Sequence, residues 1–386
     1  MLALDAARFP LVDFEFVANA QNEWVALIVR PHCVPGTDFL RALFGSSDLL
    51  TAIAPLDCLL PLESAEALTP SLYDILPPNR VAFMLPAAVL AREPEARAAA
   101  RLADEGYRVL VDGVAPEGSK LPAFLRTGAR DCAHAAPAPV SPLFGPHLAY
   151  EVDDSGRFAE CEAAGYEWFC GRYPMTAPQP ESGHDGTSRR RLLALLALLA
   201  RDADTCELEQ MLKQDAALSF HLLKLVNSAA FSVNIEITSF AQAIHVLGRR
   251  QLQRWLQLLL YAHQRADGPP NLLLPLAAMR GAQMEALNRE HGGDRDQQDL
   301  AFMVGAFSLL DRLFDTPMED IIGALRLPAH ALDALLRREG RLGEQLALIE
   351  GRADAVRHAQ AGIAADVWWR SQLQGWQWAI QVGRHV

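Results

Sequence analysis

One stretch of the chain, residues 215–248, limits the possible folds more than any other. It opens with Asp215, whose carboxylate can accept hydrogen bonds from the free backbone N–H groups at the start of a helix. An apolar stripe at helical spacing follows, and one face of this helix must therefore be buried. The positions of the stripe are Leu218, Leu222, Leu225 and Val226.

The same stretch predicts where this helix ends and where a second one begins. Asn227 and Ser228 do not continue the apolar period, so we expect the chain to leave the helix there. Ser239 to Gln242 has the S-x-x-Q form of a capping box, and Gly248 supplies a left-handed stop after the next helix. The stretch therefore predicts a helical domain.

These residues resemble the core signature of the HDOD domain, an all-helical bacterial signalling module related in fold to HD-type metal phosphohydrolases. Residues 301–327 resemble the later part of the same domain, as it occurs behind an EAL-like barrel. The matching positions are Asp215, Ala217, Leu218, Leu222, Leu223, Asn227, Ser228, Ala229, Phe231, Ala243 and Gly248.

The N-terminal half has a different pattern, in which short apolar runs alternate with helical segments, as is typical of a βα architecture. Helices are expected at residues 86–105 and 157–165, and no G-x-G-x-x-G or P-loop pattern follows a strand. The expected strands are residues 24–29, 58–62, 81–85 and 108–111.

In the order of its segments this half resembles a degenerate EAL domain, the (β/α) barrel whose active members hydrolyse cyclic di-GMP with two divalent metals. The resemblance places changed residues at the family's ligand positions. They are Val25, the apolar pair Phe83–Met84, Asp112–Gly113 in place of paired aspartates, and Cys170 in place of a glutamine. The half is also short for a full barrel, so one or more βα units are expected to be missing or reshaped.

Four carboxylates in this half remain as candidate oxygen ligands for metal ions: Asp112, Glu151, Asp153 and Asp154. Two bound cations need more negative charge than these offer. We therefore expect no enzymatic activity and keep Asp112 and Glu151 as residual ligand positions for a cyclic di-GMP receptor.

Composition restricts the partners and the location. The formal net charge of −12 disfavours nucleic acid, which needs a basic face, and also disfavours anionic lipid. The apolar run 192–200 is too short to span a bilayer, and the first residues lack the features of a signal peptide. A cytoplasmic protein without membrane insertion is expected.

The sequence predicts no metal or other cofactor. Its six cysteines contain no C-x-x-C pair and are interpreted as reduced and buried. His184 and Asp185 form the only His-Asp doublet, but they lie in a Pro/Gly/Ser-rich linker without the support that a metal site needs. The predicted organisation is an EAL-like domain at 1–178, a linker at 179–188 and an HDOD domain at 189–386.

Two features have both a packing and a binding interpretation. Asn227 and Ser228 can close a helix end or form a contact surface. Trp376, in a tryptophan-rich C-terminal segment, can belong to a core or to a partner surface.

The predicted function is non-catalytic bacterial signal transduction through contact with a protein partner. The alternatives are a catalytically inactive cyclic di-GMP receptor and a metal-dependent phosphodiesterase. The sequence specifies neither the partner nor the oligomeric state.

Overall fold

The computed structural model describes most of the chain. The described residues are 11–32, 36–45, 48–135, 137–176, 194–195, 197–198, 203–213, 240–262, 270–323, 325, 327–351 and 354–383. The chain divides into two compact units. The first consists of Met1–Thr176 and Ala353–Trp369, and the second of Ala177–Arg352 and Arg370–Val386.

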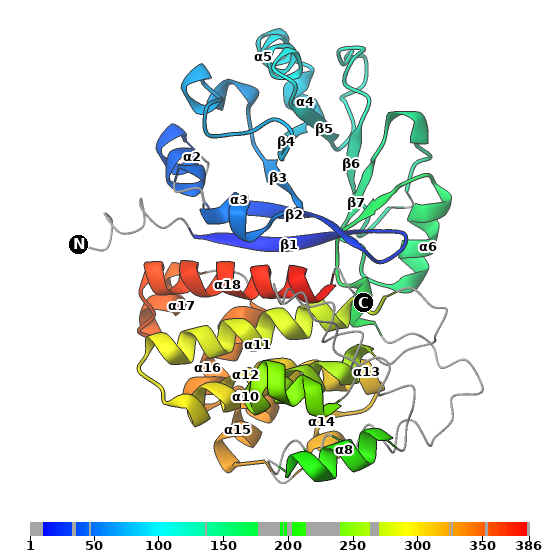
Figure 1. The fold of residues 1–386 in the computed structure, drawn as a ribbon. Coiled ribbons are helices and arrows are strands. Elements are labelled where there is room, and N and C mark those ends of the chain that lie inside the picture. Colours follow the sequence, from blue (N-terminus) through cyan, green and yellow to red (C-terminus); the bar gives the residue numbers. More distant parts are fainter. Residues whose placement is uncertain are drawn as a thin grey trace. The chain divides into compact units, whose positions relative to one another are not determined.

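The first unit is built on a closed barrel of eight strands (Figure 1). Strand β1 pairs antiparallel with both β2 and β8, whereas every pair from β2 to β8 is parallel. The strands are β1 Val12–Asn19, β2 Trp24–Pro31, β3 Asp57–Pro61, β4 Val81–Pro86, β5 Arg108–Asp112, β6 Gly128–Asp131, β7 Leu148–Tyr150 and β8 Trp168–Phe169.

The helices of this unit are unevenly distributed along the chain. Those among the strands are α2 Thr37–Phe44, α3 Asp48–Ala52, α4 Ala87–Leu90, α5 Glu93–Asp104 and α6 Ser155–Ala163. Between β5 and β6 the structure has no helix, and between β6 and β7 its described residues contain only the short 3-10 turn η3, Pro142–Phe144. The expected loss of βα units is thus a loss of crossover helices, while the barrel still closes.

The barrel interior is filled by apolar side chains. Because successive residues of a strand point to opposite faces, every second residue contributes. The cluster comprises Val17, Ala26, Ile28, Leu59, Ala82, Met84, Leu110, Ala129, Leu148, Trp168 and Cys170. It is therefore a packed core, as in other barrels of this size.

All the regular secondary structure among the described residues of the second unit is helical. Its helices are α8 Thr205–Lys213, α10 Phe240–Ala262, α11 Leu273–Glu290, α12 Arg295–Phe307, α13 Leu310–Phe314, α14 Met318–Ile322, α15 Ala329–Arg337 and α16 Gly340–Glu350. Helix α17, Ala355–Gln360, belongs to the first unit, and α18, Ala365–Gly383, contributes residues to both. The predicted fold class, α/β followed by all-α, is confirmed.

Gly248 has a positive φ of 74°, as the predicted left-handed stop requires, but its ψ of 158° lies outside the left-handed helical region. Helical geometry is interrupted at this residue, as predicted, but a second helical segment resumes directly and runs to Ala262, so α10 consists of two segments. The stop signal therefore produces a kink. Residues 215–239, the first part of the stretch 215–248 that predicts the helical domain, lie outside the described residues.

Among the described residues, no helix is long and apolar enough to cross a membrane.

Candidate functional site

The carboxyl end of the barrel carries a layer of polar side chains. On β2, β5, β6 and β7, a polar or charged residue follows the last apolar core residue by two positions along the strand. Strand β1 runs in the opposite direction, so its polar residue precedes its core residue by two positions. Period-two alternation directs these side chains toward the same face as the core. The layer consists of Glu15, Arg30, Asp112, Asp131 and Tyr150. Active sites of (β/α) barrels are built at this end.

Glu15 and Arg30 form an ion pair within this layer. Arg30 Nε donates to Glu15 Oε2 over 2.9 Å, and both side chains are about 30% exposed. Burial lowers the pKa of Arg30, but the Glu15 carboxylate, together with Cys170 and Tyr150, outweighs burial and leaves this pKa raised. The guanidinium also lies 5.6 Å from the centre of the Tyr150 ring. The carboxyl end of the barrel, which we call the barrel mouth, therefore contains a permanent positive charge that is already paired with a carboxylate.

Two further contacts complete the network. The Cys170 thiol donates to Glu15 Oε2 over 3.5 Å, and burial, reinforced by Glu15, raises the pKa of this thiol well above its usual value. The Tyr150 hydroxyl donates to Asp112 Oδ1 over 2.8 Å. Burial and then this bond raise the pKa of Tyr150, so its hydroxyl remains a donor. Glu15 and Asp112 therefore each already accept a hydrogen bond from another side chain of the protein.

The carboxylates proposed from the sequence have different environments. Asp112 lies in the polar layer, and Glu151 follows Tyr150 with a left-handed φ of 55°. Asp153 instead pairs with Arg172 at 3.1 Å, and Asp154 caps α6 by accepting from Arg157 N at 2.8 Å. The structure therefore brings Asp112 into a network and gives Asp153 and Asp154 other partners.

The positions at which the EAL resemblance predicts changed ligands are divided between the core and the polar layer, where Asp112 lies. Met84 and Cys170 belong to the apolar cluster, and Val25 packs against it. Sequence reasoning missed Glu15, Arg30 and Tyr150. The alternation of Asp13 and Glu15 with Phe14 and Phe16 could have revealed β1, and with it the acidic side of the mouth.

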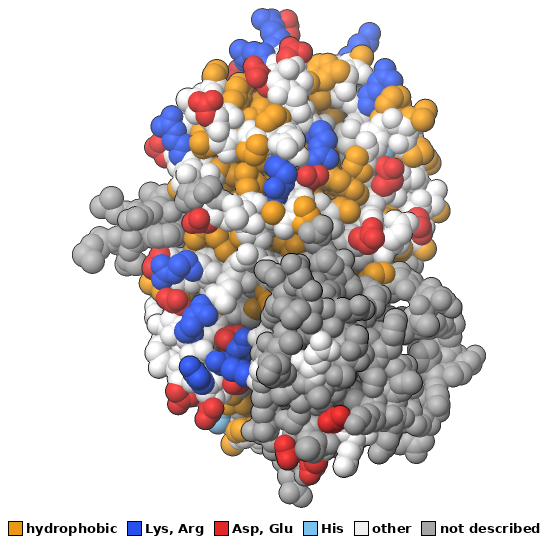
Figure 2. All heavy atoms as spheres, in the orientation of Figure 1, with side chains coloured by type: hydrophobic (Ala, Val, Ile, Leu, Met, Phe, Trp, Pro, Cys, Tyr) orange, Lys and Arg blue, Asp and Glu red, His pale blue; other side chains and the backbone are white. Residues whose placement is uncertain are grey.

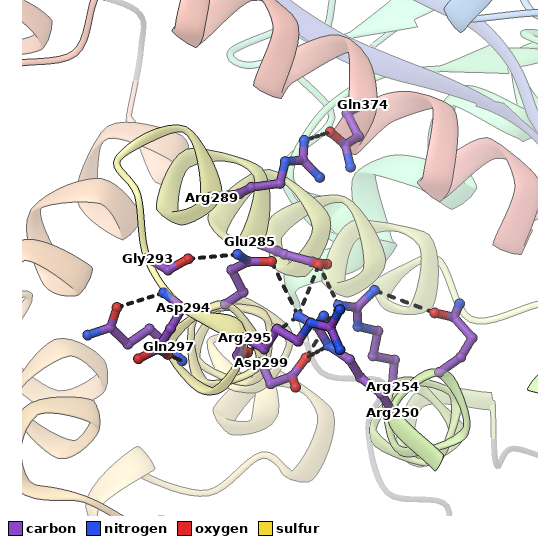
Figure 3. A network of polar contacts seen from close by, with 12 residues as sticks. Arg250, Arg254, Glu285, Arg289, Gly293, Asp294, Arg295, Gln297, Asp299 and Gln374 are labelled. Atoms are coloured by element: carbon purple, nitrogen blue, oxygen red, sulfur yellow. Dashed lines mark hydrogen bonds and ion pairs between the residues drawn. The ribbon is translucent and has the colours of Figure 1, made fainter. Parts of the chain in front are cut away.

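A second network joins three helices of the other unit (Figure 3). Arg254 from α10 binds Glu285 of α11 and lies 3.3 Å from Asp299 of α12. Arg250 binds Asp299 and lies 3.7 Å from Glu285. Burial raises the pKa of Glu285, and the two arginines act in the opposite direction. We call these four residues the helix clamp, because each arginine contacts acids from two other helices.

The remaining sequence candidates do not add to either network. Asn227, Ser228, His184 and Asp185 lie outside the described residues. Trp376 is 4% exposed, and on the same helix the Trp378 ring lies 5.0 Å from that of Trp255. Burial of Trp376 favours the packing interpretation, and a role of Trp376 in a partner surface stays a prediction. Among the described residues, no group of three or more His, Cys, Asp or Glu is arranged to hold a metal ion.

Comparison with known proteins identifies one of the domains. Residues 189–278 match the model of the HDOD domain, which confirms that resemblance for this part of the chain. The helix clamp takes both arginines from the matched region and both acids from beyond it.

Two curated relatives match over 207 residues, 53% of this chain. Cyclic di-GMP phosphodiesterase CdgJ of Vibrio cholerae is 30% identical, and uncharacterized protein YuxH of Bacillus subtilis is 26% identical. The matches cover 47% and 50% of those proteins, so this chain spans about half the length of the relatives.

Solved structures give weaker likenesses. An HDOD domain protein from Geobacter sulfurreducens has a TM-score of 0.32 at 16% identity, covering 47% of this chain and 82% of that one. BlrP1 of Klebsiella pneumoniae, in a calcium and cyclic di-GMP complex, has a TM-score of 0.33 at 12% identity, covering 43% and 55%. Likenesses at these TM-scores establish no shared site.

Proposed function

We propose that this chain is a signal-transduction protein that acts through contact with a protein partner and does not hydrolyse cyclic di-GMP. The observation that carries the proposal is the state of the barrel mouth. Glu15 is paired with Arg30, Asp112 accepts from Tyr150, and the aligned ligand positions Met84 and Cys170 are packed in the core. A metal-dependent hydrolase needs converging oxygen ligands that are free to bind cations.

The surface of the barrel unit supports a role in protein contact. Figure 2 shows hydrophobic side chains exposed among charges of both signs on one face of this unit. Leu143 on η3 is 87% exposed, and its neighbour Phe144 lies 4.5 Å beneath the Arg126 guanidinium. Exposed apolar side chains rimmed by polar ones favour protein contact.

A cyclic di-GMP receptor is the second candidate. The 30% identity with a protein named as a cyclic di-GMP phosphodiesterase supports it, and the partly exposed Arg30 guanidinium could pair with a phosphate. A metal-dependent phosphodiesterase is the third.

One pair of measurements separates these functions. In the first, the full chain is titrated with cyclic di-GMP by calorimetry in the presence of magnesium or calcium. In the second, the hydrolysis product of cyclic di-GMP is measured after incubation with magnesium or manganese. We expect neither saturable heat nor turnover. Micromolar binding that Arg30→Ala abolishes would make the chain a receptor, and turnover above a metal-free blank would overturn the non-catalytic proposal.

Protein contact is tested on the surface itself. We expect Leu143→Asp to reduce the recovery of a specific partner from bacteria that express the tagged chain, because a charge is placed in an apolar contact. Val356→Asp is the control, since Val356 is 63% exposed but lies on α17, away from η3 in the sequence. Equal recovery with both variants would exclude η3 as the contact.

A further inference from the structure

The exposed large apolar side chains of the barrel unit gather in two of its connections, the one between β5 and β6 and the one between β6 and β7. The described residues expose five such side chains, and four of them lie in these connections. They are Val114, Phe124, Leu143 and Phe144, with exposed fractions of 78%, 48%, 87% and 37%. In their described residues, these same two connections have no α-helix (Figure 1). Apolar exposure therefore coincides with the loss of crossover helices.

Three contacts join the two connections into one surface. Arg126 Nε donates to Ala123 O over 2.8 Å and so closes the turn that carries Phe124. The Arg126 guanidinium lies 4.5 Å from the centre of the Phe144 ring. The Thr127 hydroxyl donates to the Phe144 carbonyl oxygen over 2.7 Å. We call the resulting surface the loop patch, and its residues are Phe124, Arg126, Leu143 and Phe144.

Hydrogen bonds fix the chain beneath the loop patch. His147 is 3% exposed, and its Nδ1 accepts from Gly128 N over 3.0 Å. Nε2 therefore carries the proton of the neutral ring and donates to Ser141 O over 2.9 Å. Phe144 N donates to the same carbonyl oxygen over 3.1 Å. A surface that is held in place before binding loses little conformational freedom when a partner binds.

The loop patch carries a positive charge. Arg126 and the nearby Lys120 are both exposed, and neither forms an ion pair with a carboxylate in the part of the chain that the structure describes. Glu167, at the end of the second connection, instead accepts from His147 N over 3.3 Å. A guanidinium that stacks on an aromatic ring can still bind a carboxylate through its terminal N–H groups.

These features select one kind of occupant. A second copy of the chain would bring its own formal net charge of −12 toward the first, and this repulsion disfavours self-association. An acidic segment of another protein complements the positive charge of Arg126, and a large apolar side chain on it would remove the exposed rings from water.

We propose that the loop patch binds an acidic peptide segment of a partner protein. A large apolar side chain of this segment packs against Phe124, Leu143 and Phe144, while a neighbouring carboxylate pairs with Arg126. The inference rests on the proposed function, because it gives the chemistry of the partner that this function requires.

Peptide selection on the unaltered full chain tests this chemistry. A phage-displayed library of random peptides is selected on the immobilised protein, and the enriched sequences are compared with those enriched on an empty support. We expect enriched peptides in which Phe, Trp, Leu or Ile stands next to Asp or Glu. Enrichment of basic or uncharged sequences, or no enrichment over the empty support, would overturn the proposal.

Variants then locate the binding. The most enriched acidic peptide is synthesised with a fluorescent label, and its Kd is measured by anisotropy. We expect Arg126→Glu and Leu143→Ser each to raise the Kd about tenfold or more, and Arg126→Lys to raise it less, because lysine keeps the charge. Arg101→Glu makes the same change in net charge at an exposed position of α5, in a different connection, and should leave the Kd within about twofold. Equal Kd values for Arg126→Glu and Arg101→Glu would contradict the assigned contact.

A second peptide tests the carboxylate itself. When its Asp and Glu residues are replaced by Asn and Gln, the peptide should bind the natural chain about tenfold more weakly, and Arg126→Glu should weaken this neutral peptide far less than the acidic one. An equal loss with both peptides would show that no carboxylate pairs with Arg126. Circular dichroism shows that each variant is folded.

Failure of this inference can be told apart from failure of the proposed function. If partner recovery depends on Leu143 but peptide binding is unaffected by the charge at Arg126, the contact role stands and the acidic chemistry is wrong. Turnover of cyclic di-GMP would overturn the proposed function without changing the Kd values of the peptides.

Discussion

Tyr150 and Asp112 are joined by a hydrogen bond of 2.8 Å that reaches across β6, the strand between their own strands. The bond places a neutral phenol next to a carboxylate at the barrel mouth, because burial and Asp112 together raise the pKa of Tyr150. Asp112, one of the two residual ligand candidates from the sequence, is therefore engaged with the protein. The bond links strands β5 and β7, which do not pair directly with each other.

The first prediction concerns this bond. Tyr150→Phe removes the donor and leaves a partly buried carboxylate with one partner fewer, which should lower the free energy of unfolding by about 1–2 kcal/mol. Asp112→Asn should cost less, since the amide oxygen still accepts the bond. Urea denaturation of both single variants and the double variant gives the coupling energy. A coupling energy near zero would mean that the bond does not contribute to stability.

The helix clamp gives a second prediction, with a matched control in the same network. Arg254 is 16% exposed at its side chain and binds the buried Glu285, whereas Arg250 is 35% exposed. Arg254→Met leaves Glu285 with only the 3.7 Å contact to Arg250 and should cost about 3 kcal/mol. Arg250→Met should cost about 1 kcal/mol or less, because water screens the more exposed pair.

The reason for this difference can be tested separately. If the cost in Arg254→Met comes from an uncompensated buried charge, adding Glu285→Gln should restore part of the lost stability in urea denaturation. If the double variant is less stable than Arg254→Met alone, the loss comes instead from packing, including the 5.3 Å contact of Arg254 with the Phe302 ring.

His358 predicts how stability depends on pH. The residue is 5% exposed, and its ring lies 4.2 Å from that of Trp368. Burial lowers the pKa of His358 below the ordinary value of 6.5, although Asp354 and Asp13 partly oppose this effect and Arg357 adds to it. The unfolded chain therefore binds a proton at a higher pH than the folded chain does. Stability is fully present above pH 6.5 and falls as the pH drops toward the folded-state pKa.

The measurement is the free energy of unfolding between pH 7.5 and 5 for the natural chain and for His358→Phe, which keeps a ring against Trp368. Binding of one proton changes the free energy of unfolding by at most about 1.4 kcal/mol per pH unit. The free energy of unfolding of His358→Phe should therefore fall less steeply with decreasing pH than that of the natural chain, by less than this amount. His330→Gln removes an exposed histidine and serves as the control. Identical slopes for the natural chain and His358→Phe would show that another group controls the acid transition.

Local signals in the sequence predicted much of this fold. The apolar runs at 24–29, 58–62, 81–85 and 108–111 are β2 to β5, because long buried strands have a strong composition signal. Strands β6, β7 and β8 were missed because they are only four, three and two residues long. The helix expected at 86–105 is divided into α4 and α5 near Pro94, since proline fits only the first turn of a helix.

The site was harder to predict than the strands for a physical reason. The antiparallel pairing of β1 with β2 brings Glu15 and Arg30 together, whereas Cys170 after β8 joins them only through barrel closure, a long-range pairing that no local pattern encodes. Asp112 was found through the resemblance to the family's paired aspartates, directly after the expected strand 108–111. The domain limits at 178 and 189 remain predictions.

Gly248 gives the last prediction, because its conformation is one that only glycine adopts at low cost. With φ 74° and ψ 158°, it lies in a region essentially closed to residues with a side chain, although the space around its Cα is open. Gly248→Ala should therefore lower the free energy of unfolding by about 1–3 kcal/mol through backbone strain alone. A stability equal to or above that of the natural chain in urea denaturation would show that α10 can run straight through this position, where alanine favours helix over glycine.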